Sequence, residues 1–234
     1  MHFKLIGILF GNLVLSIALN IDFCYRVATF TGTLTNSPAQ VIGINGQALS
    51  FNGTNSYVDM GNDNVLNGTQ NFTISFWYYL NPGASLTTPQ PIQKWGTTPY
   101  NYLITSLGSG PYMATMYGGS SGGSFYNATS YTWETGKWVH LVWTFQAGSP
   151  ATNHLYINTV DQALTSQGDY GTFGIEASTD PLQVGNGMNG KMDDIRIYNR
   201  ALSQTEVNQI YRQFKSNRAG SVFGSLFNII GSMF

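Results

Sequence analysis

The feature that most constrains the fold is an alternation of apolar and polar residues, with a period of two, across residues 47–198. In the segment 71–80, for example, Phe72, Ile74 and Phe76 fall on one side of an extended chain. This period is typical of β-strands rather than helices. It predicts three long strands, over 71–80, 137–145 and 191–198. It also predicts shorter strands over 48–51, 56–60, 91–95, 101–107, 111–117, 123–128, 154–158 and 182–185.

Short clusters of Asn, Gly, Pro and Ser separate these strands, as at 52–53, 81–83, 118–123 and 185–190. Many short strands with a turn signal every 8–12 residues or so are typical of an antiparallel sandwich. No helices alternate with the strands, which excludes a doubly wound parallel sheet. The predicted fold class is therefore all-β, with two antiparallel sheets.

One helix is expected after the last strand. Ser203-Gln-Thr-Glu206 has the spacing of a capping box, in which each side chain bonds the other residue's backbone N–H. Apolar residues then follow at helical spacing, at Val207, Ile210, Tyr211 and Phe214. We expect this stripe to pack on the outside of the sandwich.

Composition restricts the function. Charged residues are only 9% of the 234 residues, with 10 Lys and Arg against 11 Asp and Glu. A net charge of −1 argues against nucleic-acid binding driven by counterion release. The single cysteine excludes a disulfide framework and a cysteine-rich zinc site within one chain. Aromatic residues, at 14%, are plentiful enough for both a core and a binding surface.

The first residues resemble a secretory signal. A cationic start precedes an apolar run over 5–19, and small residues at Ser16 and Ala18 suit a signal peptidase. We therefore predict a signal peptide over 1–18 and a secreted, extracellular protein. An uncleaved anchor or an ordinary buried first strand are the alternatives. The N-glycosylation sequons are consistent with secretion, although chance alone would give about as many. They lie at Asn52, Asn67, Asn71 and Asn127.

The C-terminal segment 220–234 carries no charged side chain, and its apolar residues recur at helical spacing. Such a segment could lie on a membrane surface, dock on a partner or associate with a second copy of the chain. It is too short to span a bilayer. The alternative is a tail that is tucked on the domain or disordered. We assign the whole of 215–234 to this apolar tail.

One sequence motif is rejected. Gly185-Asn-Gly-Met-Asn-Gly190 fits the dinucleotide-binding pattern, but that pattern needs a helix after it, and here a strand follows. The glycines are expected to form turns. Catalysis also lacks support, because the chain has only three Glu residues and contains no Glu-x-Asp or Glu-x-x-x-Glu pair that could supply the two acids of glycoside hydrolysis. No catalytic residue is predicted, and the protein is expected not to be an enzyme.

Three segments are similar to a known family. Residues 47–59 with 72–77 resemble the opening of LamG-like jellyroll domains in the concanavalin A-like lectin/glucanase superfamily. Residues 190–207 resemble their closing strand and capped helix, and residues 136–142 resemble an internal strand containing Trp-x-His. The resemblance extends over about 45–214. It implies a concanavalin A-like jellyroll sandwich, which we assign to residues 19–214.

The resemblance also implies a structural Ca²⁺ between the opening loop and the last strand. The matching positions are Asn52, Gly53 and Asp193, although Asn52 stands where related sequences often have Asp. Asp193 is expected on the same strand face as Ile195 and Ile197, where a cation would compensate its charge. The alternative is that Asp193 bonds backbone amides, Arg196 or Arg200.

The family implies carbohydrate binding on a sheet face or at the rim loops. Sugars are bound by aromatic rings together with a few directed hydrogen bonds. The candidate rings, taken from the loop-rich stretch 81–133, are Trp95, Tyr117, Tyr126 and Trp133. The alternative is that these rings fill the core. We predict a secreted, non-catalytic module for carbohydrate or glycosylated surfaces. The other possibilities are a structural or adhesion protein that docks through its tail, and an accessory piece of a hydrolase.

Overall fold

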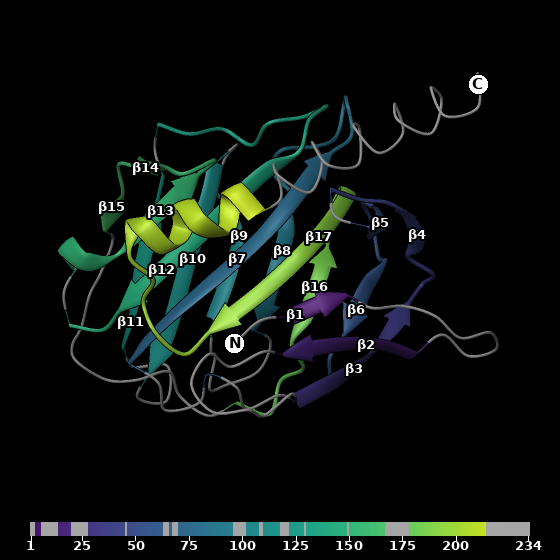
Figure 1. The fold of residues 1–234 in the computed structure, drawn as a ribbon, viewed down its shortest axis with the longest axis horizontal. Helices are drawn as coiled ribbons and strands as arrows, with labels where there is room; N and C mark the ends of the chain where they lie inside the picture. The colour runs from purple at the N-terminus through teal and green to yellow at the C-terminus, as the bar shows by residue number, and fades with distance from the viewer. Residues whose placement is uncertain are drawn as a thin grey trace, which may run out of the picture.

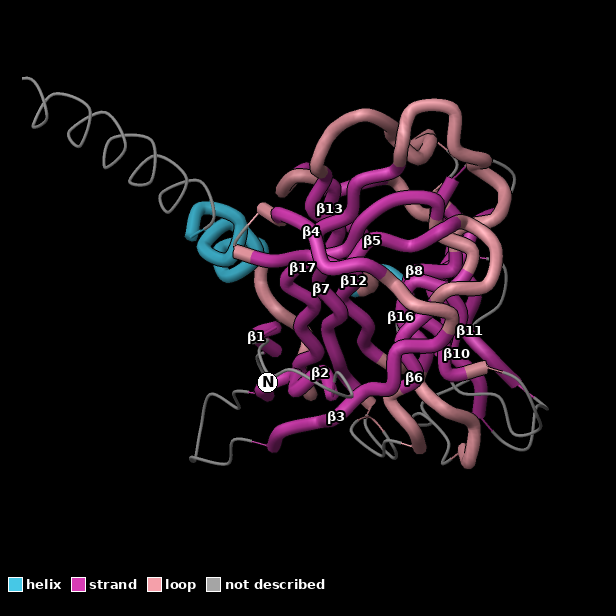
Figure 2. Tube along the Cα trace, turned by 90° about the vertical axis from the view of Figure 1, so that its right-hand side faces the viewer, coloured by secondary structure: helices cyan, strands magenta, loops and turns pink. Residues whose placement is uncertain are grey.

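The computed structural model describes two antiparallel β-sheets packed face to face, with one helix on the outside (Figure 1). The described residues are 3–5, 14–19, 28–44, 46–62, 66, 70–95, 102–107, 110–117, 122–128, 130–148, 150–166 and 178–213. In side view the helix, the seven-stranded sheet and most of the ten-stranded sheet follow one another as layers, while the first strand of the ten-stranded sheet lies on the helix side (Figure 2). The predicted all-β sandwich is confirmed.

The ten-stranded sheet has the order β1-β2-β3-β6-β16-β8-β9-β10-β11-β15. Its strands are β1 (Phe3–Leu5), β2 (Val14–Leu19), β3 (Ala28–Thr35), β6 (Tyr57–Asp59), β8 (Gln90–Lys94), β9 (Tyr102–Leu107), β10 (Gly110–Tyr117), β11 (Gly122–Asn127), β15 (Thr165–Ser166) and β16 (Gln183–Asn186).

The seven-stranded sheet has the order β14-β13-β12-β7-β17-β5-β4. Its strands are β4 (Ala39–Ile42), β5 (Gln47–Asn52), β7 (Asn71–Leu80), β12 (Val139–Gln146), β13 (His154–Ile157), β14 (Val160–Gln162) and β17 (Asn189–Tyr198). A short 3₁₀ helix, η1 (Pro150–Thr152), precedes β13. The predicted strands between residues 47 and 198 are all present, within about two residues at most ends.

Strands β1 and β2 pair antiparallel and extend the ten-stranded sheet beyond β3. Both lie in or next to the segment 1–18, for which the sequence predicts a signal peptide with a first strand as the alternative. Signal-peptide cleavage stays a prediction. The apolar tail, 215–234, lies outside the described residues, and so its docking also stays a prediction. Among the described residues, no helix is long and apolar enough to cross a membrane.

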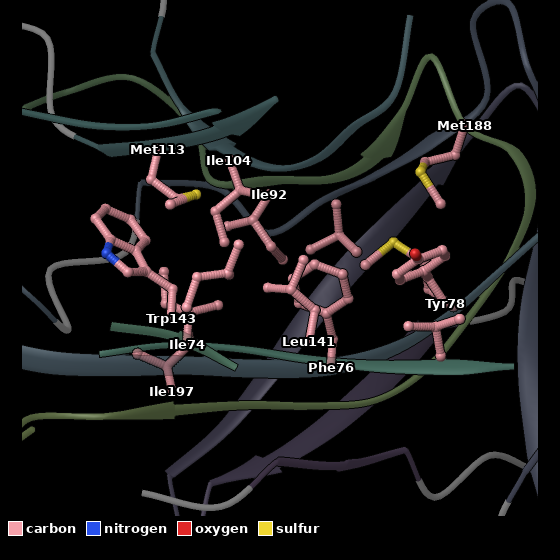
Figure 3. Packing of buried hydrophobic residues seen from close by; sticks show 14 of the residues in the cluster. Ile74, Phe76, Tyr78, Ile92, Ile104, Met113, Leu141, Trp143, Met188 and Ile197 are labelled. Carbon is pink, nitrogen blue, oxygen red and sulfur yellow. The ribbon is translucent and has the colours of Figure 1, made fainter. Parts of the chain in front are cut away.

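The core lies between the two sheets. Figure 3 shows Ile92, Ile104 and Met113 from the ten-stranded sheet pointing toward side chains of the other sheet. These opposing side chains are Ile74, Phe76, Leu141 and Trp143, and all of them are fully buried. The period-two alternation therefore identifies the inward face of β7 and β12 correctly.

A helix spans 204–213 and crosses the outer face of the seven-stranded sheet (Figure 1). The predicted capping box is confirmed, since the backbone N–H of Ser203 donates to Glu206 Oε2 at 2.9 Å. Arg200 forms an ion pair with Glu206 at 2.6 Å, and these contacts lower the pKa of Glu206 to about 2. The helix buries Val207 and Ile210 against Trp77 and Tyr198 of the sheet.

The layer beneath the helix also contains polar groups. His140 is fully buried, and its Nε2 lies 2.9 Å from Ser75 Oγ. The rings of Trp77, His140 and Tyr211 contact one another, with centroid distances of 4.9 Å from Trp77 to His140, 5.4 Å from Trp77 to Tyr211 and 5.8 Å from His140 to Tyr211. Burial and the nearby charge of Arg196 lower the pKa of His140 to about 3, so this ring is neutral at physiological pH. Its surroundings indicate a structural histidine.

Strand β17 departs from simple alternation. Its pairing with β7 shifts between Asp193 and Arg196, and Asp194 has a φ of 47°. This β-bulge places one extra residue in β17, so the residues before and after it exchange faces. Asp193 pairs with Trp77 on the outer face, whereas Ile197 pairs with Ile74 on the inner face. The prediction that Asp193 and Ile197 share a face is therefore wrong.

Candidate functional site

The two sheets differ in the elements that cover their outer faces. The helix covers part of the seven-stranded sheet, whereas within the described part of the chain no helix lies on the ten-stranded sheet (Figure 2). On this second sheet Ile92 of β8, Ile104 of β9 and Met113 of β10 point into the core. Because side chains alternate along a strand, the residues next to each of them in sequence point outward. The outward side chains of the ten-stranded sheet form the candidate site.

These outward residues align in register. One continuous row crosses seven neighbouring strands and is made of Thr33, Asp59, Gln183, Gln93, Leu103, Ala114 and Phe125. A second, shorter row beside it contains Thr105, Tyr112 and Asn127. We call these two rows the platform. Its longer row changes from polar side chains over β6, β16 and β8 to apolar and aromatic ones over β9, β10 and β11.

The aromatic end of the platform is a stacked pair. The rings of Tyr112 and Phe125 lie 6.2 Å apart between centroids, at an interplanar angle of 20°. Both side chains are partly exposed, while Ala114 of β10, which pairs with Phe125, is buried. Burial raises the pKa of Tyr112, so its hydroxyl remains protonated and can donate a hydrogen bond. This end offers an apolar ring surface with polar groups at its border.

The polar end of the platform is a set of amides. Gln93 Nε2 donates to Gln183 Oε1 at 2.5 Å, and Asn186 Nδ2 donates to the same oxygen at 3.2 Å. These bonds orient the Gln93 and Gln183 side chains while leaving each amide further hydrogen-bonding capacity. Asp59 stands next to Gln183 in the row, and its Oδ1 accepts the backbone N–H of Gly61 at 2.8 Å. This end can therefore both donate and accept.

The four rings predicted from the sequence are not brought together on the surface. Tyr126 and Trp133 are 1% and 2% exposed and belong to the core, so the prediction of an exposed rim is wrong for both. The polar atom of Tyr126 has a partner in the interior, since its Oη accepts a hydrogen bond from Asn153 at 2.8 Å. Trp95 is partly exposed and lies two residues beyond Gln93. Tyr117 ends β10, and its side chain lies outside the described part of the chain.

Tyr112 and Phe125 are not among the predicted site residues. In β10, which contains Tyr112, and in β11, which contains Phe125, each face of the strand carries an aromatic or apolar side chain. The alternation pattern therefore does not predict which face is buried. In β11, for example, Phe125 and Tyr126 are neighbours on opposite faces, and only the pairing with β10 and β15 decides between them. The register supplies the information that the sequence lacks.

The predicted calcium ligands do not form one site. Asn52 pairs with Asn189, four residues before Asp193 on β17, which corresponds to about 13 Å along the strand. Asn52 Oδ1 accepts the backbone N–H groups of residues 54–56 at 2.9–3.1 Å. Gly53 has a φ of 79° and donates to Met188 O. These contacts organise a turn rather than a cation site.

Asp193 likewise faces donors. Its Oδ2 accepts the N–H of Ile44 and its Oδ1 the N–H of Asp194, each at 2.8 Å. An added Cβ at Gly43 would lie 2.3 Å from Asp193 Oδ2, so glycine allows the chain to come close to this carboxylate. Backbone amides, one of the alternatives for Asp193, compensate its charge. The described residues also hold no cluster of three or more His, Cys, Asp and Glu side chains. The predicted ligands thus do not fit calcium.

We expect chelation to leave the protein unchanged. Because Asp193 and Asn52 are held by N–H donors, 5 mM EDTA should shift the melting temperature by less than about 1 °C. Differential scanning fluorimetry, with and without added CaCl₂, measures this shift. Stabilisation that grows with the calcium concentration would contradict the expectation and would require a cation site elsewhere in the chain.

The rejected dinucleotide motif is a β-hairpin. Gly185 and Gly187 have φ values of 83° and 65°, and an added Cβ would contact Phe51 and Thr88 O, respectively. The third glycine, Gly190, lies in β17 against the backbone of Tyr79. Strand β16 therefore turns directly into β17, with no helix N-terminus to receive a phosphate. The prediction that these glycines form turns is confirmed for the first two.

Solved structures show the same architecture. Domain 4 of AbnA, an extracellular GH43 arabinanase from Geobacillus stearothermophilus, was solved with arabinotriose. It is 22% identical, covers 78% of this chain and 89% of its own, and has a TM-score of 0.58. The binding domain of Paraclostridial Mosquitocidal Protein 1 is 18% identical, with a TM-score of 0.59 over 87% of this chain.

A ligand-binding domain of botulinum neurotoxin serotype D, in complex with N-acetylneuraminic acid, is 14% identical, with a TM-score of 0.55 over 84% of this chain. This chain spans about half the length of both toxin domains, 52% and 50%. No curated protein matches the sequence significantly. The matching family model is the one described as the concanavalin A-like lectin/glucanases superfamily, and it covers residues 52–208. The chain belongs to this superfamily.

Proposed function

We propose that this protein is a secreted, non-catalytic carbohydrate-binding module and that the platform is its binding surface. The observation that carries the proposal is the stacked, partly exposed Tyr112–Phe125 pair, which adjoins oriented glutamine side chains on the same sheet face. The solved neighbours with bound arabinotriose and N-acetylneuraminic acid support a sugar as the class of ligand.

The chemistry of the platform suits a saccharide. A sugar ring has a C–H face that packs on aromatic rings and hydroxyl groups that need directed hydrogen bonds. Phe125 supplies the apolar contact, and the ring of Tyr112 stacked beside it carries a hydroxyl group. Gln93 keeps its Oε1 as an acceptor and Gln183 keeps its Nε2–H donors, so together the two amides can both donate to and accept from hydroxyl groups.

The distribution of carboxylates supports the absence of catalysis. Glycoside hydrolysis uses two carboxyl groups that flank the scissile bond, about 5–9.5 Å apart. Asp59 is the one carboxylate in the two rows of the platform. Asp193 and Asp194 are buried in β17 of the other sheet, where each already has hydrogen-bond or ion-pair partners. Binding without turnover is therefore the function proposed.

The Phe125→Ala variant should lose carbohydrate binding. Removing an aromatic anchor from a binding surface typically costs about 1–2 kcal/mol or more, so we expect affinity to fall at least about tenfold. The measurement is a titration against the best glycan of an array. Tyr79→Ala is the matched control, because Tyr79 is a partly exposed ring on the outer face of the other sheet.

Both variants should remain folded, as circular dichroism and thermal melting would report. Equal loss of affinity in Phe125→Ala and Tyr79→Ala, or loss in Tyr79→Ala alone, would place the site elsewhere. Asn127 is a sequon within the platform, so a glycan attached there would obstruct the surface. The protein for this titration should therefore come from a host without N-glycosylation.

A further inference from the structure

We infer that the platform binds neutral saccharides and discriminates against those that carry carboxylate or sulfate groups. The inference rests on the proposed function and specifies its class of ligand. It comes from the positions of the charged side chains that the structure describes, which are few and unevenly distributed between the two outer faces.

The cationic side chains that the structure describes lie outside the two rows of the platform. Lys191 and Arg196 belong to the outward side of β17 in the seven-stranded sheet, where Lys191 Nζ lies 4.7 Å from the centroid of the Tyr79 ring. Arg196 is bound to Asp194, and Arg200 is bound to Glu206 beside the helix. The two others outside the ten-stranded sheet are Lys137, which pairs with Glu134, and Arg212, which lies in the helix.

Lys94 is adjacent in sequence to the platform residue Gln93, but its side chain points into the interior. Lys94 follows Gln93 in β8, and its side chain is fully buried. It therefore faces the opposite side of the sheet from Gln93, and its Nζ donates to Asn62 Oδ1 at 2.9 Å. The alternation of side chains along β8 therefore places the Gln93 amide on the outer face of the sheet and the Lys94 ammonium group in the interior.

The charge that remains on the platform is negative. Asp59 lies beside Gln183 in the row, and its carboxylate would repel an anionic sugar seated on the neighbouring amides. Proteins usually bind a carboxylate or sulfate through charge-assisted bonds from Arg or Lys, and an anion that loses its hydration without such a partner binds weakly. Hydroxyl groups incur no such penalty here, because the glutamine amides and the Asp59 carboxylate can bond them.

The test is a glycan array that pairs each neutral oligosaccharide with its sialylated or uronic-acid counterpart, probed with the full chain. We expect the neutral member to bind at least about tenfold more tightly within each pair that gives a signal. Because no ion pair is involved, its affinity should change less than about twofold between 50 and 500 mM NaCl. Tighter binding of the acidic members would overturn this inference and leave the proposed function intact, whereas binding to no glycan would overturn both.

A charge variant tests the role of Asp59 directly. Asp59→Asn keeps an oxygen that can accept the Gly61 N–H but removes the negative charge. We expect it to raise the affinity for acidic relative to neutral glycans about threefold to fivefold. Asp161→Asn is the control, since Asp161 is exposed on β14 of the other sheet, where it contacts His154. An unchanged ratio in Asp59→Asn, or an equal change in both variants, would contradict the inference.

Discussion

Gly190→Ala should remove most of the stability of the fold. An added Cβ at Gly190 would lie 2.0 Å from Tyr79 O and 2.9 Å from the Leu80 Cα, both backbone atoms of the neighbouring strand. Strands β17 and β7 are central in the seven-stranded sheet, so neither can move aside without disturbing the core. We expect a loss of about 3–5 kcal/mol in the free energy of unfolding.

Urea unfolding followed by tryptophan fluorescence measures this loss. Gly83→Ala is the matched control, because Gly83 has a φ of 78° but an added Cβ there would meet no atom within 4 Å. That variant should lose only about 1 kcal/mol, the usual cost of forcing alanine into a left-handed conformation. If the two variants were equally stable, the close approach of β17 to Tyr79 would not be a constraint on residue 190.

The sequence places Gly190 in two recognisable motifs but does not indicate why glycine is required at this position. This glycine opens the segment 190–207, which carries the resemblance to LamG-like domains, and its spacing also completes a dinucleotide motif. The residues after the glycine decide between these two interpretations, and the alternation beyond Met192 correctly predicts a strand. The steric reason for glycine arises from the pairing with β7. That pairing joins residues more than a hundred positions apart, so no local pattern contains it.

The fold is predictable wherever one face of a strand is apolar and the other polar or covered by the helix. Strand β12 is an example, with Leu141 and Trp143 inward. The same rule is wrong at β17, because alternation assumes a regular strand, and the bulge at Asp194 inserts one residue. Asp194 is a residue type that tolerates its positive φ, but aspartate is also common in the turns that flank strands, so its presence alone does not predict a bulge.

The binding surface is less predictable than the fold. The predicted rings come from a stretch rich in Gly, Ser, Thr and Asn, a composition that favours exposed loops. The strands predicted over 101–107, 111–117 and 123–128 are present as β9, β10 and β11, but each of them has one buried face, which composition does not identify. The sequence therefore does not distinguish Tyr126 from Phe125 as the exposed ring, whereas the structure buries Tyr126 and leaves Phe125 partly exposed. A platform assembled from seven strands depends on register, which composition does not encode.

The ion pair between Arg196 and Asp194 yields the second large effect. Arg196 Nε lies 2.7 Å from Asp194 Oδ2, and both side chains are 3–4% exposed. Replacing Arg196 by Met keeps much of its volume but leaves the carboxylate buried without its cation. Breaking a buried pair in this way typically costs about 3–5 kcal/mol, and we expect a loss in this range for Arg196→Met.

The double variant Arg196→Met with Asp194→Asn separates the charge from the packing. Asparagine also tolerates the φ of 47° at position 194, so the bulge can remain. Because the uncompensated charge is gone, we expect the double variant to recover at least about 1–2 kcal/mol relative to Arg196→Met. Arg200→Met is the control, since Arg200 and Glu206 are 48% and 33% exposed, and such a pair contributes about 1 kcal/mol or less. A loss in Arg196→Met no larger than in Arg200→Met would mean that solvent reaches the bulge and that the helix does not seal this pair from water.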